Sequence, residues 1–195
     1  LLLVRGTDAG QTTLLHALIN AIEPDERLVT VEDALELQLS RHGERHRNLV
    51  ELECREQNVE GQGEVTMRYL TRLALRLSPD RLIVGEARGP EILDMFQAMS
   101  QGNDGSMGTL HARSSADAFV QITRYALKAP EHLTPEAVAV DIAASLDLVL
   151  HLHKLHDGRR VVSSLREITG YDGAQVLSNE VFAPDSQRRA AFRTP

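Results

Sequence analysis

The sequence is poor in three features, and each shortage excludes a class of protein. Its single cysteine, Cys54, excludes an internal disulfide framework and favours a reducing compartment. No apolar run approaches the roughly 20 residues that a membrane-spanning helix needs, and the opening Leu-Leu-Leu-Val is too short for a signal peptide. Positive charge is not in excess, and the formal net charge of −7 argues against nucleic-acid binding. We predict a cytoplasmic protein that neither enters a membrane nor binds nucleic acid.

The bulk of the chain has an ordinary globular composition. Its 195 residues are 42% hydrophobic and 25% charged, which suits one domain with a sizeable core. The first residue is Leu1, which already belongs to an apolar run. We therefore expect the chain to be a piece of a longer protein.

Hydrophobic periodicity predicts alternating strands and helices up to about residue 145. The predicted strands are residues 1–4, 27–33, 48–54, 81–86 and 106–112, and the predicted helices are residues 12–22, 66–77, 90–99, 115–128 and 134–145. Three further strand-like segments, 146–153, 159–168 and 175–182, are separated by Asp-Gly turns, as in an antiparallel meander. We predict an α/β domain over residues 1–182, with a mainly parallel sheet, helices on both faces and the meander at its C-terminal edge. Residues 183–195 are predicted to be a basic, flexible tail.

Each predicted strand of the parallel part ends in polar residues or is directly followed by them. They are the segment 5–13, Glu32 with Asp33, Cys54 with Arg55, Glu86, and His111. Ligands of open parallel sheets bind at the carboxyl ends of the strands, so this edge suits a Mg²⁺-nucleotide. Thr12 is then a candidate metal ligand, Glu86 a candidate holder of a metal-bound water, and Glu32 a candidate base for the attacking water.

The segment 5–13, Arg-Gly-Thr-Asp-Ala-Gly-Gln-Thr-Thr, has the layout of a phosphate-binding loop between a strand and a helix. In the pattern G-x-x-x-x-G-K-[ST], Gly10 and Thr12 fit, whereas Arg5 replaces the first glycine and Gln11 replaces the lysine. The segment therefore fits either a degraded nucleotide site or a plain strand-to-helix connection.

The other motifs also have structural alternatives. Glu32 with Asp33, taken alone, is more often a strand end or a helix cap, and His111 alone is more often a structural histidine than a functional one. Arg68, Arg72 and Arg76 lie four residues apart, which is also typical of a solvated helix face. In His-Leu-His-Lys-Leu-His, residues 151–156, no carboxylate or cysteine stands at a metal-ligand spacing, so we expect an exposed edge strand rather than a metal site.

The order of these motifs resembles the secretion ATPase superfamily of type II and type IV secretion, most nearly the tight-adherence (Flp) pilus assembly ATPases. The resemblance rests on residues 29–39, 58–118 and 144–150 and extends over residues 1–182. It implies a RecA-like P-loop ATPase domain that uses ATP and Mg²⁺. Full-length members have a preceding N-terminal domain, form cytoplasmic hexameric rings, and drive pilus assembly or secretion with platform proteins at the inner membrane.

The resemblance also implies roles for residues. The nucleotide-binding positions are Gly6, Thr7, Gly10, Gln11, Thr12 and Thr13. Thr12 is the implied Mg²⁺ ligand, with Glu86 holding the ion through water. Glu32 is the implied catalytic carboxylate, Glu86 belongs to the second Walker motif, and His111 senses the γ-phosphate. The implied phosphate-contacting arginines are Arg55, Arg72, Arg76 and Arg88.

The departures from the family concentrate in the loop, which is close to G-G-T-G-S-G-K-T-T in its members. Gln11 removes a charge-assisted contact of roughly 1.5–3 kcal/mol, and Asp8 adds a carboxylate beside the triphosphate. We predict weakened ATP turnover; the alternative is a non-hydrolysing structural or regulatory paralogue that assembles with an active ring. Arg5 carries a positive charge, but its position calls for glycine-like backbone freedom, so we expect Arg5 to be displaced rather than to repair the loop.

Overall fold

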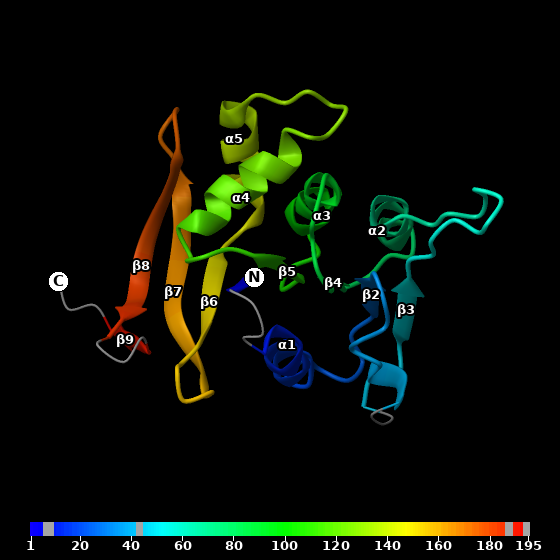
Figure 1. Ribbon diagram of the computed structural model, residues 1–195, viewed down its shortest axis with the longest axis horizontal. Helices are drawn as coiled ribbons and strands as arrows, with labels where there is room; N and C mark the ends of the chain where they lie inside the picture. Colours follow the sequence, from blue (N-terminus) through cyan, green and yellow to red (C-terminus); the bar gives the residue numbers. More distant parts are fainter. Residues whose placement is uncertain (6–9, 42–44, 186–188, 193–195) are drawn as a thin grey trace.

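The computed structural model describes residues 1–5, 10–41, 45–185 and 189–192. Within these ranges one nine-stranded sheet has the order β3-β2-β4-β5-β1-β6-β7-β8-β9 (Figure 1). The strands are β1 (Leu2–Arg5), β2 (Leu28–Glu32), β3 (Leu49–Glu53), β4 (Arg81–Val84), β5 (Met107–His111), β6 (Leu148–Lys154), β7 (Arg160–Tyr171), β8 (Val176–Pro184) and β9 (Ala190–Phe192). Pairing is parallel from β3 to β6 and antiparallel from β6 to β9.

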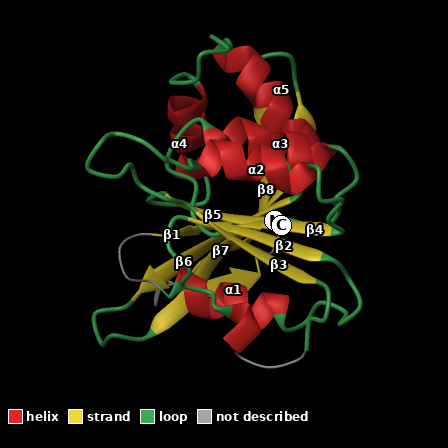
Figure 2. Ribbon diagram, turned by 90° about the vertical axis from the view of Figure 1, so that its right-hand side faces the viewer, coloured by secondary structure: helices red, strands yellow, loops and turns green. Residues whose placement is uncertain are grey.

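Helices cover both faces of the sheet. They are α1 (Gln11–Ile19), α2 (Met67–Leu75), α3 (Glu91–Ser100), α4 (Asp117–Ala126) and α5 (Pro135–Ser145), with a short 3-10 helix, η1 (Leu39–Arg41). Figure 2 shows α1 on one face and α2 to α5 on the other. The longest has 11 residues, and none in the described ranges is long and apolar enough to span a bilayer. The predicted α/β class with helices on both faces is confirmed.

The sheet is buried because its parallel strands carry apolar residues on both faces. Leu2 and Val4 pack into one core cluster, beneath α2 to α5, and Leu3 packs into a second cluster beneath α1. An apolar run buried on both sides is the pattern expected of a central parallel strand. Thr66 and Thr134 begin α2 and α5 as N-caps, each accepting a hydrogen bond from a backbone N–H three residues later.

The histidine-rich segment 151–156 does not form an exposed edge strand. β6 lies inside the sheet, parallel to β1 on one side and antiparallel to β7 on the other. His151 is buried, with Nδ1 2.6 Å from the hydroxyl oxygen of Ser163, and burial lowers its pKa. The part of the chain that the structure describes holds no group of three potential metal ligands.

Residues 183–195 are not a free tail throughout. β8 extends to Pro184, and β9 pairs antiparallel with it, opposing Phe192 to Phe182. Basic residues and a terminal proline indicated a flexible end, but the short apolar run Ala190–Phe192 adds a last strand to the sheet edge. The domain boundary at residue 182 stays a prediction.

Candidate functional site

A cavity lies at the carboxyl ends of the parallel strands, beside the first turn of α1. Its described polar lining is Arg5 from β1, Gln11 and Thr12 from α1, Glu32 from β2, and Glu86 and Arg88 after β4, with Asp33, Glu36 and Thr109 beside them. The strand order brings these residues together, since β2, β4, β5 and β1 are consecutive neighbours in the sheet. Part of the polar edge that the sequence predicts therefore lines one cavity, whereas Cys54, Arg55 and His111 are not among the described lining residues.

Gln11 begins α1 and is almost completely buried, with 4% of its surface exposed. Its Nε2 donates hydrogen bonds to the backbone oxygens of Leu3 (2.7 Å) and Leu110 (3.2 Å). Its Oε1 accepts a hydrogen bond from Nε of Arg5 at 2.6 Å. The side chain that stands in the lysine position is thus fixed between β1 and β5.

The prediction that Arg5 is displaced because its position needs glycine-like backbone freedom is wrong. Arg5 is the last residue of β1, opposite His111 of β5 and Leu152 of β6, and its half-buried side chain lines the cavity. Pairing on both sides holds the backbone of Arg5 extended, which needs no glycine.

The remaining loop positions divide into three groups. Gly10 is the N-cap of α1 with φ of 83°, a backbone conformation that strains any residue with a side chain, and a Cβ there would also displace the flexible Arg160 side chain, whose Cδ lies 2.5 Å away. Thr12 lines the cavity and its hydroxyl donates to Oε2 of Glu36 at 3.3 Å, whereas Thr13 is exposed and is not among the described lining residues. Gly6 and Thr7 lie outside the described residues.

Glu32 is a buried carboxylate with one uncommitted oxygen. Only 3% of the residue is exposed, and Oε2 accepts hydrogen bonds from the backbone N–H groups of Glu36 (3.0 Å) and Leu37 (2.9 Å). Oε1 is buried and has no partner among the described residues. Burial raises the pKa of Glu32, outweighing the two backbone hydrogen bonds that lower it. A raised pKa and a vacant lone pair suit a proton acceptor.

Glu86 connects His111 to Arg88. Nε2 of His111 lies 2.8 Å from Oε1 of Glu86, and Nη2 of Arg88 donates to Oε2 at 2.8 Å. Arg88 also reaches Asp33 at 3.4 Å. The predicted residues Thr12, Glu32 and Glu86 therefore share one cavity, and His111 contacts it through Glu86.

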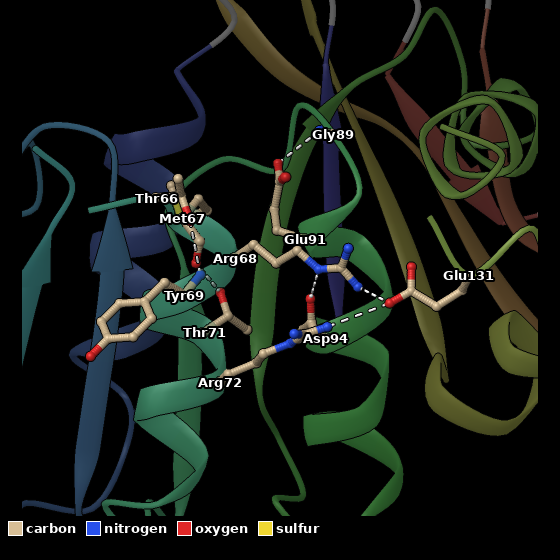
Figure 3. Close-up of polar contacts among 10 residues, drawn as sticks. All are labelled: Thr66, Met67, Arg68, Tyr69, Thr71, Arg72, Gly89, Glu91, Asp94 and Glu131. Atoms are coloured by element: carbon tan, nitrogen blue, oxygen red, sulfur yellow. Dashed lines mark hydrogen bonds and ion pairs between the residues drawn. The ribbon is translucent and has the colours of Figure 1, made fainter. Parts of the chain in front are cut away.

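The other three predicted arginines are not among the described lining residues of the cavity. Nε of Arg72 donates to Oδ1 of the buried Asp94 at 2.6 Å, and Arg68 pairs with the same carboxylate and with Glu131 (Figure 3). Arg55 donates to the backbone oxygen of Gly63 at 2.6 Å, and Arg76 is exposed at the end of α2. The helix face of Arg68 and Arg72 is an ion-pair cluster, not a solvated stripe.

Sequence reasoning missed two acidic residues of α3. Asp94 joins α2 to α3 through both arginines, and Glu91 accepts hydrogen bonds from the backbone N–H groups of Arg88 (2.6 Å) and Gly89 (2.7 Å), the latter drawn in Figure 3. Glu91 thereby fixes the turn that carries Arg88 to Glu86. The available signal was an acid in the first helical turn, directly after Gly89-Pro90.

The ion-pair cluster leads to a first prediction. We expect Arg72→Met to lower the free energy of unfolding by roughly 1 kcal/mol, because Arg68 still pairs with Asp94 and the Arg72 side chain is 54% exposed. Affinity for Mg-ATP should not change. Urea unfolding and calorimetric titration measure both, with the exposed Arg124→Met on α4 as the matched control. If Arg72→Met lost nucleotide affinity and Arg124→Met did not, Arg72 would contact phosphate after all.

Comparison with known proteins identifies similar chains. Residues 1–182 match the family described as type II/IV secretion system protein. The chain is 42% identical over 168 residues to Rv3659c, a Mycobacterium tuberculosis protein named for conjugal transfer, covering 86% of this chain and 46% of that protein. It is 33% identical over 155 residues to the type IV secretion system protein VirB11 of Brucella suis, covering 78% and 42%. The chain therefore spans about half the length of the curated relatives it matches.

The fold has solved counterparts. The VirB11 ATPase of the Brucella suis type IV secretion system superposes with a TM-score of 0.73 at 32% identity, covering 84% of this chain and 46% of that one. The pilus retraction motor PilT gives a TM-score of 0.57 at 20% identity, covering 96% and 48%, which is a likeness of fold alone. The predicted RecA-like arrangement is confirmed.

Proposed function

The chain belongs to the type II/IV secretion system protein family, and from that membership we propose that it is the nucleotide-binding domain of an ATPase that powers pilus assembly or protein secretion. The observation that carries the proposal is the cavity at the strand ends, where Oε1 of the buried Glu32 has no described partner. A deeply buried carboxylate oxygen without a hydrogen-bond partner destabilises the fold, which points to a functional role for that oxygen.

The lining residues fit Mg²⁺ and a triphosphate. Mg²⁺ takes one or two protein oxygen ligands and completes its shell with water and phosphate, so Thr12 and Glu86 would suffice to hold it. When bound, the ion neutralises phosphate charge. Glu32 accepts the proton of the attacking water at Oε1, and its raised pKa makes it a stronger base. The related VirB11 ATPase was solved in complex with sulphate, an anion with the tetrahedral shape of a phosphate group.

Glu86 has a part of its own in the proposed reaction. Its Oε1 lies 2.8 Å from Nε2 of His111 and its Oε2 accepts a hydrogen bond from Nη2 of Arg88, so the carboxylate lies beside the end of β5. A γ-phosphate beside Glu86 is therefore also within the neighbourhood of the His111 imidazole. His111 reports the presence of that phosphate through its contact with Glu86.

Gln11 lowers the expected turnover, because an uncharged amide replaces a lysine. The second candidate function, a non-hydrolysing structural or regulatory subunit, is favoured by the same residue. In either case we propose a homo- or hetero-hexameric ring in the full-length protein, bound at the cytoplasmic face of the inner membrane to the platform proteins of a pilus or secretion system. The tight-adherence (Flp) pilus is the system proposed.

The test is Mg-ATP affinity and Mg²⁺-dependent phosphate release for the chain and for Glu86→Gln. We expect measurable binding, and a ten- to hundredfold loss of turnover in Glu86→Gln, because it weakens the orientation of the metal site. Glu60→Gln, on an exposed residue after β3, is the matched control. Binding without turnover would select the non-hydrolysing subunit, and no Mg-ATP binding would overturn the ATPase function.

A further inference from the structure

We propose that Arg5, held in place by Gln11, supplies the phosphate-contacting cation that the loop pattern otherwise takes from lysine. The inference rests on the proposed function, because it assigns a residue to the triphosphate of the bound nucleotide. It makes Arg5 the residue that touches phosphate and Gln11 the residue that positions it.

The Gln11 amide has no hydrogen-bond donor left for a phosphate. Both hydrogens of a glutamine amide can donate, and here Nε2 donates to Leu3 and to Leu110. Its Oε1 accepts from Arg5 at 2.6 Å, and an acceptor cannot bind phosphate oxygen. The residue at the lysine position therefore acts on a ligand only through its neighbour.

Arg5 is the uncommitted cation of the cavity. Its Nε donates to a neutral amide oxygen, and within the described ranges no carboxylate forms an ion pair with it. Arg88, the other arginine among the described lining residues, is paired with Glu86 and Asp33. With Nε engaged by Gln11, the two terminal nitrogens of Arg5 keep four N–H donors, in the planar fork that matches phosphate oxygens.

The position of Arg5 also suits a ligand at this edge. Arg5 ends β1 in register with His111, so its side chain leaves the sheet at the same rim as Glu32 and Glu86. Those two carboxylates give the cavity negative charge, which a triphosphate tolerates only with cations beside it. The hydrogen bond from Nε to Gln11 fixes the plane of the guanidinium before any ligand arrives, which lowers the entropy lost on binding.

The test is a double-mutant cycle on Mg-ATP affinity, measured by calorimetry for the unsubstituted chain, Arg5→Met, Gln11→Met and the double variant. We expect Arg5→Met to weaken binding roughly ten- to hundredfold, as for the loss of hydrogen bonds to a charged group. Gln11→Met should weaken binding when Arg5 is present and have little effect in the Arg5→Met background. If the role of Gln11 were merely structural, Gln11→Met would reduce Mg-ATP affinity by the same factor in both backgrounds.

Two further variants keep the test decisive. Arg5→Lys retains the charge without the Nε donor and should fall between the unsubstituted chain and Arg5→Met. Arg41→Met is the matched control, since Arg41 also donates to a glutamine Oε1, that of Gln38, but is exposed on η1 outside the described lining. Thermal unfolding of each variant checks that the fold is intact.

The outcomes separate this inference from the proposed function. Mg-ATP binding that Arg5→Met leaves unchanged overturns the role of Arg5 and leaves the proposed function standing. Equal losses from Gln11→Met in both backgrounds overturn the positioning role of Gln11. No Mg-ATP binding by the unsubstituted chain overturns the proposed function and this inference with it.

Discussion

Glu32→Gln is expected to lower ATP turnover by about 10²–10⁴-fold, the contribution typical of a general base. Glutamine has the shape of the carboxylate but no basic oxygen. Its amide oxygen can still accept the hydrogen bonds that Oε2 now receives from Glu36 and Leu37. Loss of turnover with little change in Mg-ATP affinity would therefore report the chemistry of Oε1 rather than a collapse of the site.

The same substitution should stabilise the fold near neutral pH. Burial raises the pKa of Glu32, so the charged carboxylate is less favourable in the folded chain than in the unfolded one. Replacing it should add about 1 kcal/mol, which corresponds to roughly 2–4 °C in melting temperature at this chain length. Because the pKa of Glu32 is higher in the folded chain than in the unfolded chain, the charged carboxylate destabilises the fold by its full amount at pH values above the folded pKa. As the pH falls through the folded pKa toward the usual glutamate range, Glu32 becomes protonated and the two proteins should converge.

Thermal unfolding from pH 4 to 8 and steady-state phosphate release provide the measurements. Glu53→Gln is the matched control, since Glu53 is the residue opposite Glu32 at the end of β3, but is exposed and accepts a single backbone hydrogen bond, from Leu35. Retained turnover in Glu32→Gln would show that another group takes the proton. A melting temperature below that of the unsubstituted chain would show that Oε1 is compensated in the folded state.

The parts of the fold that follow from local pattern were predictable. Unbroken apolar runs such as Leu2–Val4 and Leu82–Val84 form the central strands, and Thr134-Pro135 begins α5 as its capping pattern predicts. The prediction that residues 151–156 form an exposed edge strand was wrong, because alternating histidines suggest a strand with one face exposed to solvent. The parallel neighbour of β6 is β1, nearly the whole domain away in sequence, and local pattern does not encode such a pairing.

The candidate site divides in the same way. Glu32, Glu86 and His111 were predictable because strand order alone brings strand ends together. Arg72 was assigned to phosphate by family pattern, but Asp94, 22 positions on and 4% exposed, binds it instead. The orientation of the Arg5 side chain depends on its hydrogen bond to Gln11, and neither residue taken alone indicates that this hydrogen bond forms.

Restoring both family residues together, with Arg5→Gly and Gln11→Lys, is expected to raise ATP turnover by about 10²-fold. This is the lower value for one preorganised donor at a developing charge. The single changes should do less. Arg5→Gly removes the uncommitted cation and should weaken Mg-ATP binding. Gln11→Lys replaces an acceptor of the Arg5 hydrogen bond with a second positive charge, and two like charges about 4 Å apart repel by about 4 kcal/mol at an effective dielectric constant of 20.

The effects of the two substitutions should therefore be strongly non-additive, as expected for residues in contact. Steady-state phosphate release and Mg-ATP affinity of the four proteins give the coupling directly. Arg5→Ala with Gln11→Lys is the control that separates loss of the arginine charge from the backbone freedom of glycine, which itself costs roughly 0.5–1 kcal/mol within a strand. If Gln11→Lys alone matched the double variant, Arg5 would not oppose a lysine at position 11, and the two residues would not act as a unit. If instead the double variant alone gains turnover, the Arg5–Gln11 pair is an alternative to the glycine–lysine pair, and neither residue can be exchanged without the other.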